Sequence, residues 1–252
     1  MKTQILITIF FSFILIAQGQ DKGISNKSQN LLKNLNQIRK DNHKSEIKED
    51  SLLIKSLIYL GKNDLLENND KDIIRQALRR NNNYDYKIEI VKIVTDGADS
   101  LNISKQIQKS KKLSDCLNDT LFNKIGIFTD ENRANEFYLL LSQHYVDVVS
   151  FYLSGPLLDP IRNTVVRPQS FVIEGFLTTN NNFYYRILKD KNPADLRKIE
   201  KCRLDSNFFK GLYGFTPPKD KQYFEIETDD DQGTIEILNS SGEVVNLFNG
   251  FR

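Results

Sequence analysis

Residues 136–153, EFYLLLSQHYVDVVSFYL, form a long apolar stretch in the middle of the chain. Apolar side chains occupy both alternating sets of positions along it: Phe137, Leu139 and Leu141 in one set, Tyr138 and Leu140 in the other. A strand that is apolar on both faces needs cover on both faces, which is typical of a sheet between two layers of helices. Together with the shorter strand pattern KIGIF at 124–128, the stretch predicts a central sheet that serves as a scaffold.

The segments around this sheet predict helices that could cover it. Apolar residues recur at helical spacing around residues 28–42, 51–60, 70–80 and 102–112. Asp50 or Ser51 can cap the second of these helices, and Gly61 can end it. Alternation in YDYKIEIVKIV, residues 84–94, predicts a further strand. Residues 20–153 are therefore expected to form an α/β domain with three layers, a sheet between two layers of helices.

The last hundred residues have a different pattern. Pro156, Pro160 and Pro168 interrupt regular structure and predict a linker over residues 154–170. Short strand patterns with turn signals between them follow: SFVIEGFL, FYYRILKD, KCRL, FKGLYGF, QYFEIET and GTIEILN, with NPADLRKIEK interpreted as a helical turn. This spacing predicts a small all-β sandwich domain over residues 171–252.

The first residues predict export. Lys2 precedes an uncharged apolar run from Ile5 to Ala17, and Ala17 and Gly19 fit a small-residue cleavage site. The run is shorter than the ~20 residues of a membrane-spanning helix. Residues 1–19 are therefore interpreted as a signal peptide, with an uncleaved anchor as the alternative. The mature protein is expected to be secreted or extracellular, or periplasmic in a Gram-negative bacterium, without a membrane span.

The charge balance limits the class of partner. Loss of the signal peptide removes one lysine from the 35 basic residues and leaves the 33 acidic residues unchanged. A nearly neutral protein lacks the basic surface with which nucleic-acid-binding proteins displace counterions. A protein partner or a surface glycan is therefore expected instead of a nucleic acid.

Cys116 and Cys202 are the two cysteines of the chain. In an exported protein they could form a disulfide, which would close a long loop and restrict the unfolded chain by about 4 kcal/mol. The alternative is two buried thiols that pack as small apolar residues. Because two cysteines do not make a disulfide-dense scaffold, the hydrophobic core must stabilise the fold in either case.

Two segments resemble the CAP superfamily, which comprises cysteine-rich secretory, antigen 5 and pathogenesis-related type 1 proteins. LLKNLNQIRKDNH, residues 31–43, is similar to the opening helix of that family, in which an Asn and an Arg follow a Leu pair. LFNKIGIF followed by EFYLLLSQHY is similar to the family's central pair of strands. The resemblance covers residues 28–150 and implies a three-layer α-β-α sandwich.

The same resemblance implies a cavity in which many family members hold two histidines and two glutamates around a divalent ion. This chain has only His43 and His144, and its LSDCLND segment has no histidine in the family's characteristic loop before the IG strand. The resemblance therefore implies a degenerate site, with His43 and His144 as candidate residues of a residual cavity.

No sequence motif predicts a catalytic, metal or cofactor site. The chain has no H-E-x-x-H, G-x-S-x-G or G-x-G-x-x-G motif and no Walker loop, so neither a metal nor a cofactor is expected. Asp229–Asp231 could offer oxygen ligands to Ca²⁺, with a solvated hairpin loop as the other interpretation. Because a carboxylate pair needs no local motif, an exported hydrolase with carboxylates in the α-β-α cavity is an alternative function.

Aromatic residues are dense in FFKGLYGFTPP, residues 208–218, where two glycines and two prolines favour an exposed segment. Phe208, Phe209, Tyr213 and Phe215 are candidate binding residues for a protein partner or a glycan. The sequence thus predicts a secreted, non-catalytic binding protein. A structural component of an envelope or matrix is a further alternative.

Overall fold

A computed structural model gives the structure of the protein. It describes residues 26–95, 105–107, 109–130, 133, 135–154, 157–159, 161–162, 164–167, 170–189, 192–193, 196–202, 204–228 and 234–249. The predicted signal peptide and the acidic segment Asp229–Asp231 lie outside these residues. Among the described residues, no helix combines the length and hydrophobicity that a bilayer crossing requires.

The chain divides into two compact units. The first unit comprises Met1–Asn69 and Glu89–Leu141, and the second unit comprises Asp70–Ile88 and Ser142–Arg252. Helices and several sheets occur together, so the predicted mixed α/β class is confirmed.

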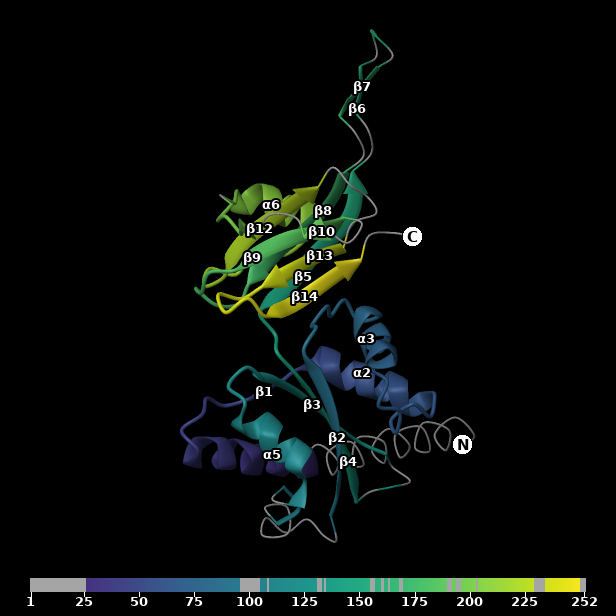
Figure 1. Cartoon of the computed structure of the whole chain (residues 1–252), viewed down its shortest axis with the longest axis vertical. Helices are drawn as coiled ribbons and strands as arrows, with labels where there is room; N and C mark the ends of the chain where they lie inside the picture. The colour runs from purple at the N-terminus through teal and green to yellow at the C-terminus, as the bar shows by residue number, and fades with distance from the viewer. Residues whose placement is uncertain are drawn as a thin grey trace, which may run out of the picture. The chain divides into compact units, whose positions relative to one another are not determined.

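The first unit is built around a four-stranded sheet (Figure 1). Its strands, in spatial order, are β1 (Lys48–Glu49), β3 (Lys124–Thr129), β4 (Glu136–Ser142) and β2 (Ile88–Val94). The predicted strands at KIGIF and EFYLLLS are confirmed, and β1 joins the first of them in parallel.

Helices pack on both faces of this sheet. The helix over residues 26–41 and α5 (Lys111–Asn118) share one apolar cluster with Ile125, Ile127 and alternate residues of β4 and β2. The opposite face of β3 packs against α2 (Ser51–Lys62), where the ring of Phe128 lies beside Gly61. Side chains alternate between the two faces of a strand, so residues 125 and 127 serve one layer of helices and residues 126 and 128 serve the other.

Gly126 allows the closest contact between α2 and the sheet. A Cβ atom at this position would lie 2.7 Å from the carbonyl carbon and Cβ of Leu53 and 2.8 Å from the nitrogen of Ile54. Since these distances are shorter than atomic contact, the helix backbone can lie on β3 only where the strand has no side chain. The predicted cap of α2 is confirmed, because Asp50 accepts hydrogen bonds from the backbone nitrogens of Leu52 and Leu53.

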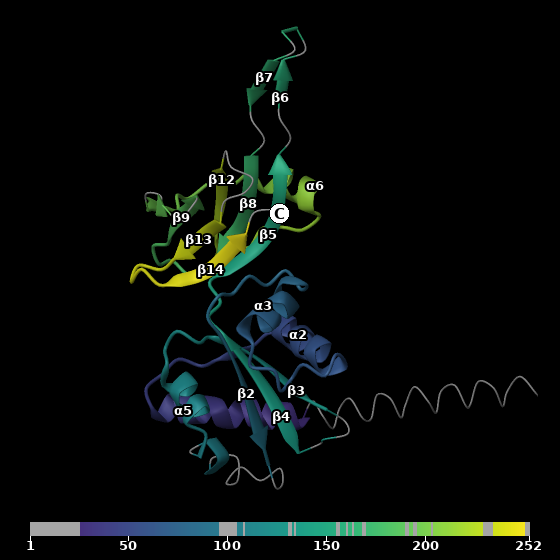
Figure 2. The ribbon, with the colours of Figure 1, turned by 45° about the vertical axis from the view of Figure 1, so that its right-hand side comes forward.

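The second unit is a sandwich of two antiparallel sheets (Figure 2). One sheet has the order β12 (Gln222–Thr228), β8 (Ser170–Leu177) and β5 (Val146–Ser154). The other contains β9 (Tyr184–Lys189), β13 (Thr234–Leu238), β14 (Val244–Asn249) and the short strands β10 (Asn192–Pro193) and β11 (Arg197–Lys198). A single apolar cluster that includes Ile173, Phe224 and Ile235 contains side chains of both sheets.

A segment from before β2 also belongs to the second unit. The helix α3 (Lys71–Arg79), capped by Asp70, leads into it. Asp85 then forms an antiparallel bridge with Asn246 of β14, and the ring of Tyr84 stacks on Phe248 at 5.0 Å between centroids. The predicted strand over residues 84–94 is therefore shorter than expected, because its first residues pair with the sandwich.

Several expected elements differ in the structure. The apolar stretch 136–153 is two strands, β4 and β5, separated by residues 143–145, and β5 pairs with β8 of the sandwich. The expected linker contains a two-stranded hairpin, β6 (Leu157–Asp159) and β7 (Thr164–Arg167). The expected helical turn at 192–201 contains the short strands β10 and β11, and the described residues of KCRL (201, 202 and 204) are not in a strand.

The FKGLYGF segment is helical, which corrects the strand interpretation. The helix α6 (Ser206–Tyr213) is capped by Asp205, which accepts hydrogen bonds from the backbone nitrogens of Asn207 and Phe208. It ends at Gly214, whose φ of 77° is the left-handed conformation that favours glycine.

Candidate functional site

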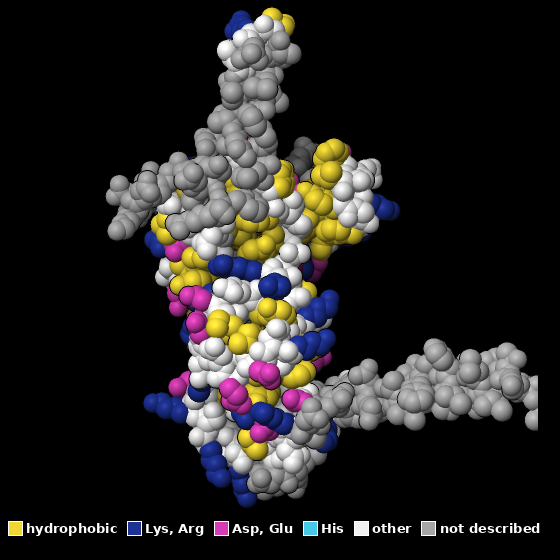
Figure 3. All heavy atoms as spheres, turned by 90° about the vertical axis from the view of Figure 1, so that its right-hand side faces the viewer, with side chains coloured by type: hydrophobic (Ala, Val, Ile, Leu, Met, Phe, Trp, Pro, Cys, Tyr) yellow, Lys and Arg dark blue, Asp and Glu magenta, His cyan; other side chains and the backbone are white. Residues whose placement is uncertain are grey.

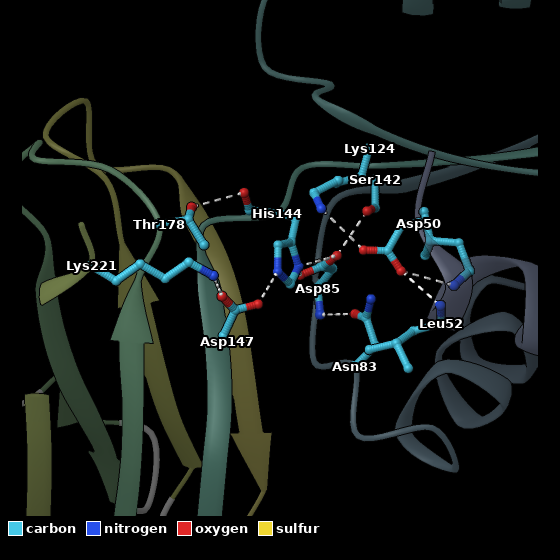
Figure 4. Close-up of polar contacts among 11 residues, drawn as sticks. Asp50, Leu52, Asn83, Asp85, Lys124, Ser142, His144, Asp147, Thr178 and Lys221 are labelled. Carbon is cyan, nitrogen blue, oxygen red and sulfur yellow. Dashed lines mark hydrogen bonds and ion pairs between the residues drawn. The ribbon is translucent and has the colours of Figure 1, made fainter. Parts of the chain in front are cut away.

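A row of alternating charges runs through the second unit from Asp85 to Lys221 (Figure 4). The Nδ1 atom of His144 lies 3.0 and 3.1 Å from the two carboxylate oxygens of Asp85. Its Nε2 atom lies 2.8 Å from Oδ1 of Asp147, and Lys221 donates to Oδ2 of Asp147. The hydroxyl of Ser142, which is uncharged, also donates a hydrogen bond to Asp85 over 2.7 Å. We call Asp85, His144, Asp147 and Lys221 the charge row.

The charge row keeps His144 protonated. Burial by itself would lower the pKa of His144, but the charge of Asp85 and the hydrogen bonds to Asp147 and Asp85 outweigh it and raise the pKa to about 10. For Asp147, burial alone would raise the pKa, yet the bonds to His144 and Lys221 hold it well below its usual range. The imidazolium is therefore a fixed cation between two carboxylates at neutral pH.

Three local features place these side chains. The break between β4 and β5 puts His144 outside both strands, and its carbonyl accepts a hydrogen bond from the hydroxyl of Thr178, directly after β8 (3.4 Å). The side-chain oxygen of Asn83 accepts the backbone N–H of Asp85 and shapes the turn before it (2.9 Å). Lys221 comes directly before β12. Segments distant in sequence thus meet at one imidazole.

The geometry favours a structural role for His144 over a catalytic one. The hydroxyl of Ser142 donates to Asp85 and not to the imidazole, so the arrangement is not the nucleophile–histidine–acid order of a serine hydrolase. Both ring nitrogens face carboxylates, and a protonated imidazole cannot accept a proton. Within the described ranges, no three histidine, cysteine or acidic side chains are grouped to hold a metal ion.

His43 and His144 lie in different compact units of the chain. His43 is exposed in the first unit, after the helix of residues 26–41, with a φ of 55°. His144 is buried in the second unit. The two histidines therefore belong to different compact units, and a residual cavity that contains both stays a prediction.

The two cysteines are free thiols in the structure. Cys116 is buried among the apolar side chains in the core of the first unit. Burial raises the pKa of its thiol to about 11. Cys202 is exposed in the second unit. Cys116 therefore corresponds to the alternative in which a buried thiol packs as a small apolar residue, whereas Cys202 does not, because it is exposed.

Hydrophobic side chains are exposed on α6 and the turn after it. Phe208 is 70% exposed, Leu212 60% and Phe215 43%, and we call these three residues the α6 surface. Hydrophobic side chains gather at the edge of the second unit where α6 lies, at the upper right of Figure 3. Large apolar residues gathered at a surface are typical of interaction sites.

The other two aromatic residues predicted for binding attach α6 to the sheet. Phe209 is buried and contacts the rings of Phe176 and Tyr223, with centroids 5.6 and 5.8 Å away. The hydroxyl of Tyr213 donates to Glu174 of β8. Of the four predicted binding residues, Phe208 and Phe215 are therefore available to a partner, whereas Phe209 and Tyr213 hold the helix in place.

Two carboxylates converge in the first unit, where the alternative hydrolase function would need them. Glu67 and Glu136 both contact the ammonium of Lys92, at 2.7 and 2.9 Å, and Tyr138 donates to Glu67 over 2.6 Å. Hydrogen bonding to Lys92 lowers the pKa of both carboxyl groups. A general acid needs a raised pKa, so this pair lacks the feature that hydrolysis by two carboxylates requires.

Most of the charge row could not be found from sequence. His144 was a candidate through the family resemblance, but Asp85, Asp147 and Lys221 carry no motif and lie in three separate segments. The local signals were the histidine within an apolar stretch and an aspartate three residues after it. The pairing of β5 with β8, and of β8 with β12, brings Asp147 and Lys221 together, and the bridge between Asp85 and Asn246 holds Asp85 in the same unit.

No family model matches the chain, and no curated protein matches it. A cysteine-rich secretory protein from Staphylococcus aureus matches with a TM-score of 0.42 and 15% identity, over 48% of this chain and 39% of that one. An outer surface protein from Borrelia burgdorferi matches with a TM-score of 0.39 and 16% identity, over 47% of this chain and 93% of that one. The chain thus spans less than half of the staphylococcal protein.

Proposed function

We propose that the protein is an exported, non-catalytic binding protein whose second unit holds a protein partner on the α6 surface. The observation that carries this proposal is the exposure of Phe208 and Leu212, which are 70% and 60% accessible. They are four residues apart on one helix and therefore lie on the same face. An aromatic and an aliphatic anchor at this spacing are typical of protein–protein contacts.

The composition of the α6 surface favours a protein over a glycan. Sugars bind to flat aromatic rings flanked by hydrogen-bonding groups, but Leu212, which lies beside Phe208, is aliphatic. Tyr213, whose hydroxyl could have bound a sugar, donates to Glu174 instead. Phe209 packs against the rings of Phe176 and Tyr223 and holds the helix on the sheet, so the position of the exposed side chains is fixed.

For the first unit, we propose a divergent CAP-like module that serves as scaffold. Support comes from the contacts of two polar residues in the opening helix. The side chain of Asn36 bonds both the N–H and the carbonyl of Ile47, at 2.8 and 3.0 Å. Arg39 is fully buried and donates to the carbonyls of Ser45, Leu117, Asp119 and Phe122. These contacts fasten the opening helix to the segment before β1 and to the loop before β3.

Site-specific photo-crosslinking tests the binding function. A benzophenone amino acid at position 208 or 212 of the full chain, exposed to the surface of cells of the source organism, should yield a discrete crosslinked protein band. Leu196 is the matched control, because it is another apolar residue of the second unit that is 55% exposed. We expect at least about five times less crosslinking there.

A chain with the double substitution Phe208→Ser and Leu212→Ser, added as a competitor, should inhibit crosslinking at least about tenfold less well than the wild-type chain. The reason is that anchor residues supply most of the binding energy. Circular dichroism and the melting temperature should not change, since both side chains are exposed. Equal crosslinking at positions 208 and 196 would refute the proposal. If the chain bound to a glycan array and this binding required Phe208, the ligand of the α6 surface would be a glycan and not a protein.

A further inference from the structure

A cleft lies beside α6 in the second unit, apart from the α6 surface. Its volume is about 350 Å³, within the ~300–1,000 Å³ of small-molecule sites. Ser206, the first residue of α6, lines the cleft together with Tyr223 of β12 and Cys202. The backbone nitrogen of Cys202 donates to the carbonyl of Tyr223 over 3.2 Å, which fixes this wall to the sheet.

The charge of the cleft is positive. Lys201, Lys219 and Lys221 line it, and Asp220 is the one acidic residue among the described residues of its lining. The lysines come from two segments that are separate in sequence, so the excess of positive charge arises from how the chain folds. A concave surface lined by one sign of charge raises the local concentration of ligands of the opposite sign.

The side chain of Lys221 is held in position by Asp147. Its ammonium donates to Asp147, whose other oxygen faces the protonated ring of His144. The charge row thus alternates in sign from Asp85 to Lys221, and Lys221 is also one of the residues that line the cleft. An anion bound against Lys221 would continue this alternation, and the lysine would lose little side-chain freedom on binding because Asp147 already orders it.

We propose that this cleft binds a small ligand through an oxyanion group, a carboxylate or a phosphate, which Lys221 receives with support from Lys201 and Lys219. Lysine, and not arginine, provides the charge at each position, so recognition depends on point charges and not on a bidentate fork. Phe176, Pro217 and Tyr223 supply apolar and aromatic surface for the remainder of the ligand. The site is independent of the partner bound on the α6 surface.

Cys202 provides a direct reporter of occupancy. It is exposed and lines the cleft, whereas the second cysteine of the chain, Cys116, is buried in the first unit. The rate of alkylation of the folded protein by iodoacetamide, a neutral reagent, therefore reports on the cleft. We expect inorganic phosphate or citrate at millimolar concentration to slow this rate at least about threefold relative to sodium chloride of equal ionic strength.

Substitutions separate binding at the cleft from general screening. The double variant Lys201→Gln and Lys219→Gln should lose the protection, whereas Lys210→Gln, which removes a charge from an exposed position of α6 outside the cleft, should retain it. Both variants keep the contact between Lys221 and Asp147, so the fold of the second unit should be preserved. Matching melting temperatures of the variants and the wild-type chain would confirm this.

Three outcomes are decisive. Protection by phosphate or citrate that depends on Lys201 and Lys219 supports the site, and the stronger of the two probes identifies the preferred oxyanion. The proposal is overturned if protection persists in the double variant, or if sodium chloride slows alkylation equally. In either case the slower alkylation is an effect of ionic strength and not of binding at the cleft. A rate unaffected by both anions also overturns it. None of these results depends on the crosslinking experiment at positions 208 and 212.

Discussion

The two units bury their sheets under different kinds of cover, and each interior contains a buried cation. In the first unit helices cover both faces, and the cation is Arg39, which donates to four backbone carbonyls. In the second unit two sheets face each other, and the cation is His144, which lies between the carboxylates of Asp85 and Asp147. One cation is thus satisfied by neutral dipoles and the other by opposite charges.

This difference predicts different responses to pH and to mutation. An arginine bound to carbonyls keeps its charge throughout the accessible pH range, so the first unit depends on the geometry of its backbone. A histidine bound to carboxylates is a titratable group, and removal of any member leaves another buried charge without its partner. The second unit should therefore be sensitive to charge, and the first unit to the close packing of its layers.

The largest effect should follow from removal of the imidazolium. His144→Leu leaves the carboxylate of Asp85, whose side chain is 1% exposed, without its cation, which costs about 3–5 kcal/mol. We expect urea unfolding to shift accordingly, and hydrogen exchange to show loss of protection in the second unit before the first. His43→Asn is the matched control, because this exposed histidine has a positive φ that asparagine tolerates. A loss of less than about 1 kcal/mol for His144→Leu would contradict the structural role of the charge row.

A pH series should give the next largest effect. The folded-state pKa of His144 is about 10, above the ~6.5 of an unfolded histidine, so its contribution is complete below pH ~6.5 and is lost as pH rises toward 10. Unfolding of the second unit by urea should therefore become easier by several kcal/mol between pH 6.5 and pH ~9.5. His144→Gln should flatten this dependence. If the two units instead lose stability equally over this range, the titrating group is not His144.

Acid should weaken the same unit for the opposite reason. The pKa of Asp147 is depressed by His144 and Lys221, so its contribution is present above the unfolded value of ~3.8 and is lost as pH falls below it. Stability of the second unit from these two groups should therefore be greatest between pH ~4 and pH ~6.5. The first unit provides the internal reference in each measurement.

The smallest effect concerns the packing of the first unit. Gly126→Ala places a methyl group 2.7 Å from the backbone of Leu53, and overpacking of this kind costs about 1–3 kcal/mol. We expect faster hydrogen exchange in α2 and β3, with the second unit unchanged. Gly211→Ala is the control, since no atom lies within 4 Å of the added Cβ and alanine favours the helix α6 by up to ~1 kcal/mol. Equal stability of wild type and Gly126→Ala would show that the α2 layer is not in direct contact with the strand.

Local signals in the sequence predicted most of the elements whose ends are marked by a specific residue. Asp50 caps α2 as expected, and SFVIEGFL and QYFEIET are strands as expected. The same kind of signal was present at Asp205 and Gly214 around α6, but the dense aromatic residues between them led to a strand interpretation. The strand β14, near the C-terminus, was not predicted.

The division of the chain was less visible, because it depends on pairing between distant segments. Residues 136–153 have a continuous apolar pattern, yet β4 joins the first sheet and β5 pairs with β8 in the second unit. Hydrophobic periodicity reports whether a strand is covered on both faces, but it does not report which strand lies beside it. The assignment of residues 70–88 to the second unit has the same origin.

By itself, the sequence determined the mixed α/β class, most helix starts and the richly aromatic segment around Phe208, since these depend on residues close together in the chain. Only the tertiary structure decided that α6 exposes Phe208 and Leu212 while Phe209 and Tyr213 are held against the sheet. It also decided that Asp85, His144, Asp147 and Lys221 form one charge row. Electrostatic contacts act over a few ångströms in space, and in this protein those distances are set by strand pairing between segments far apart in sequence.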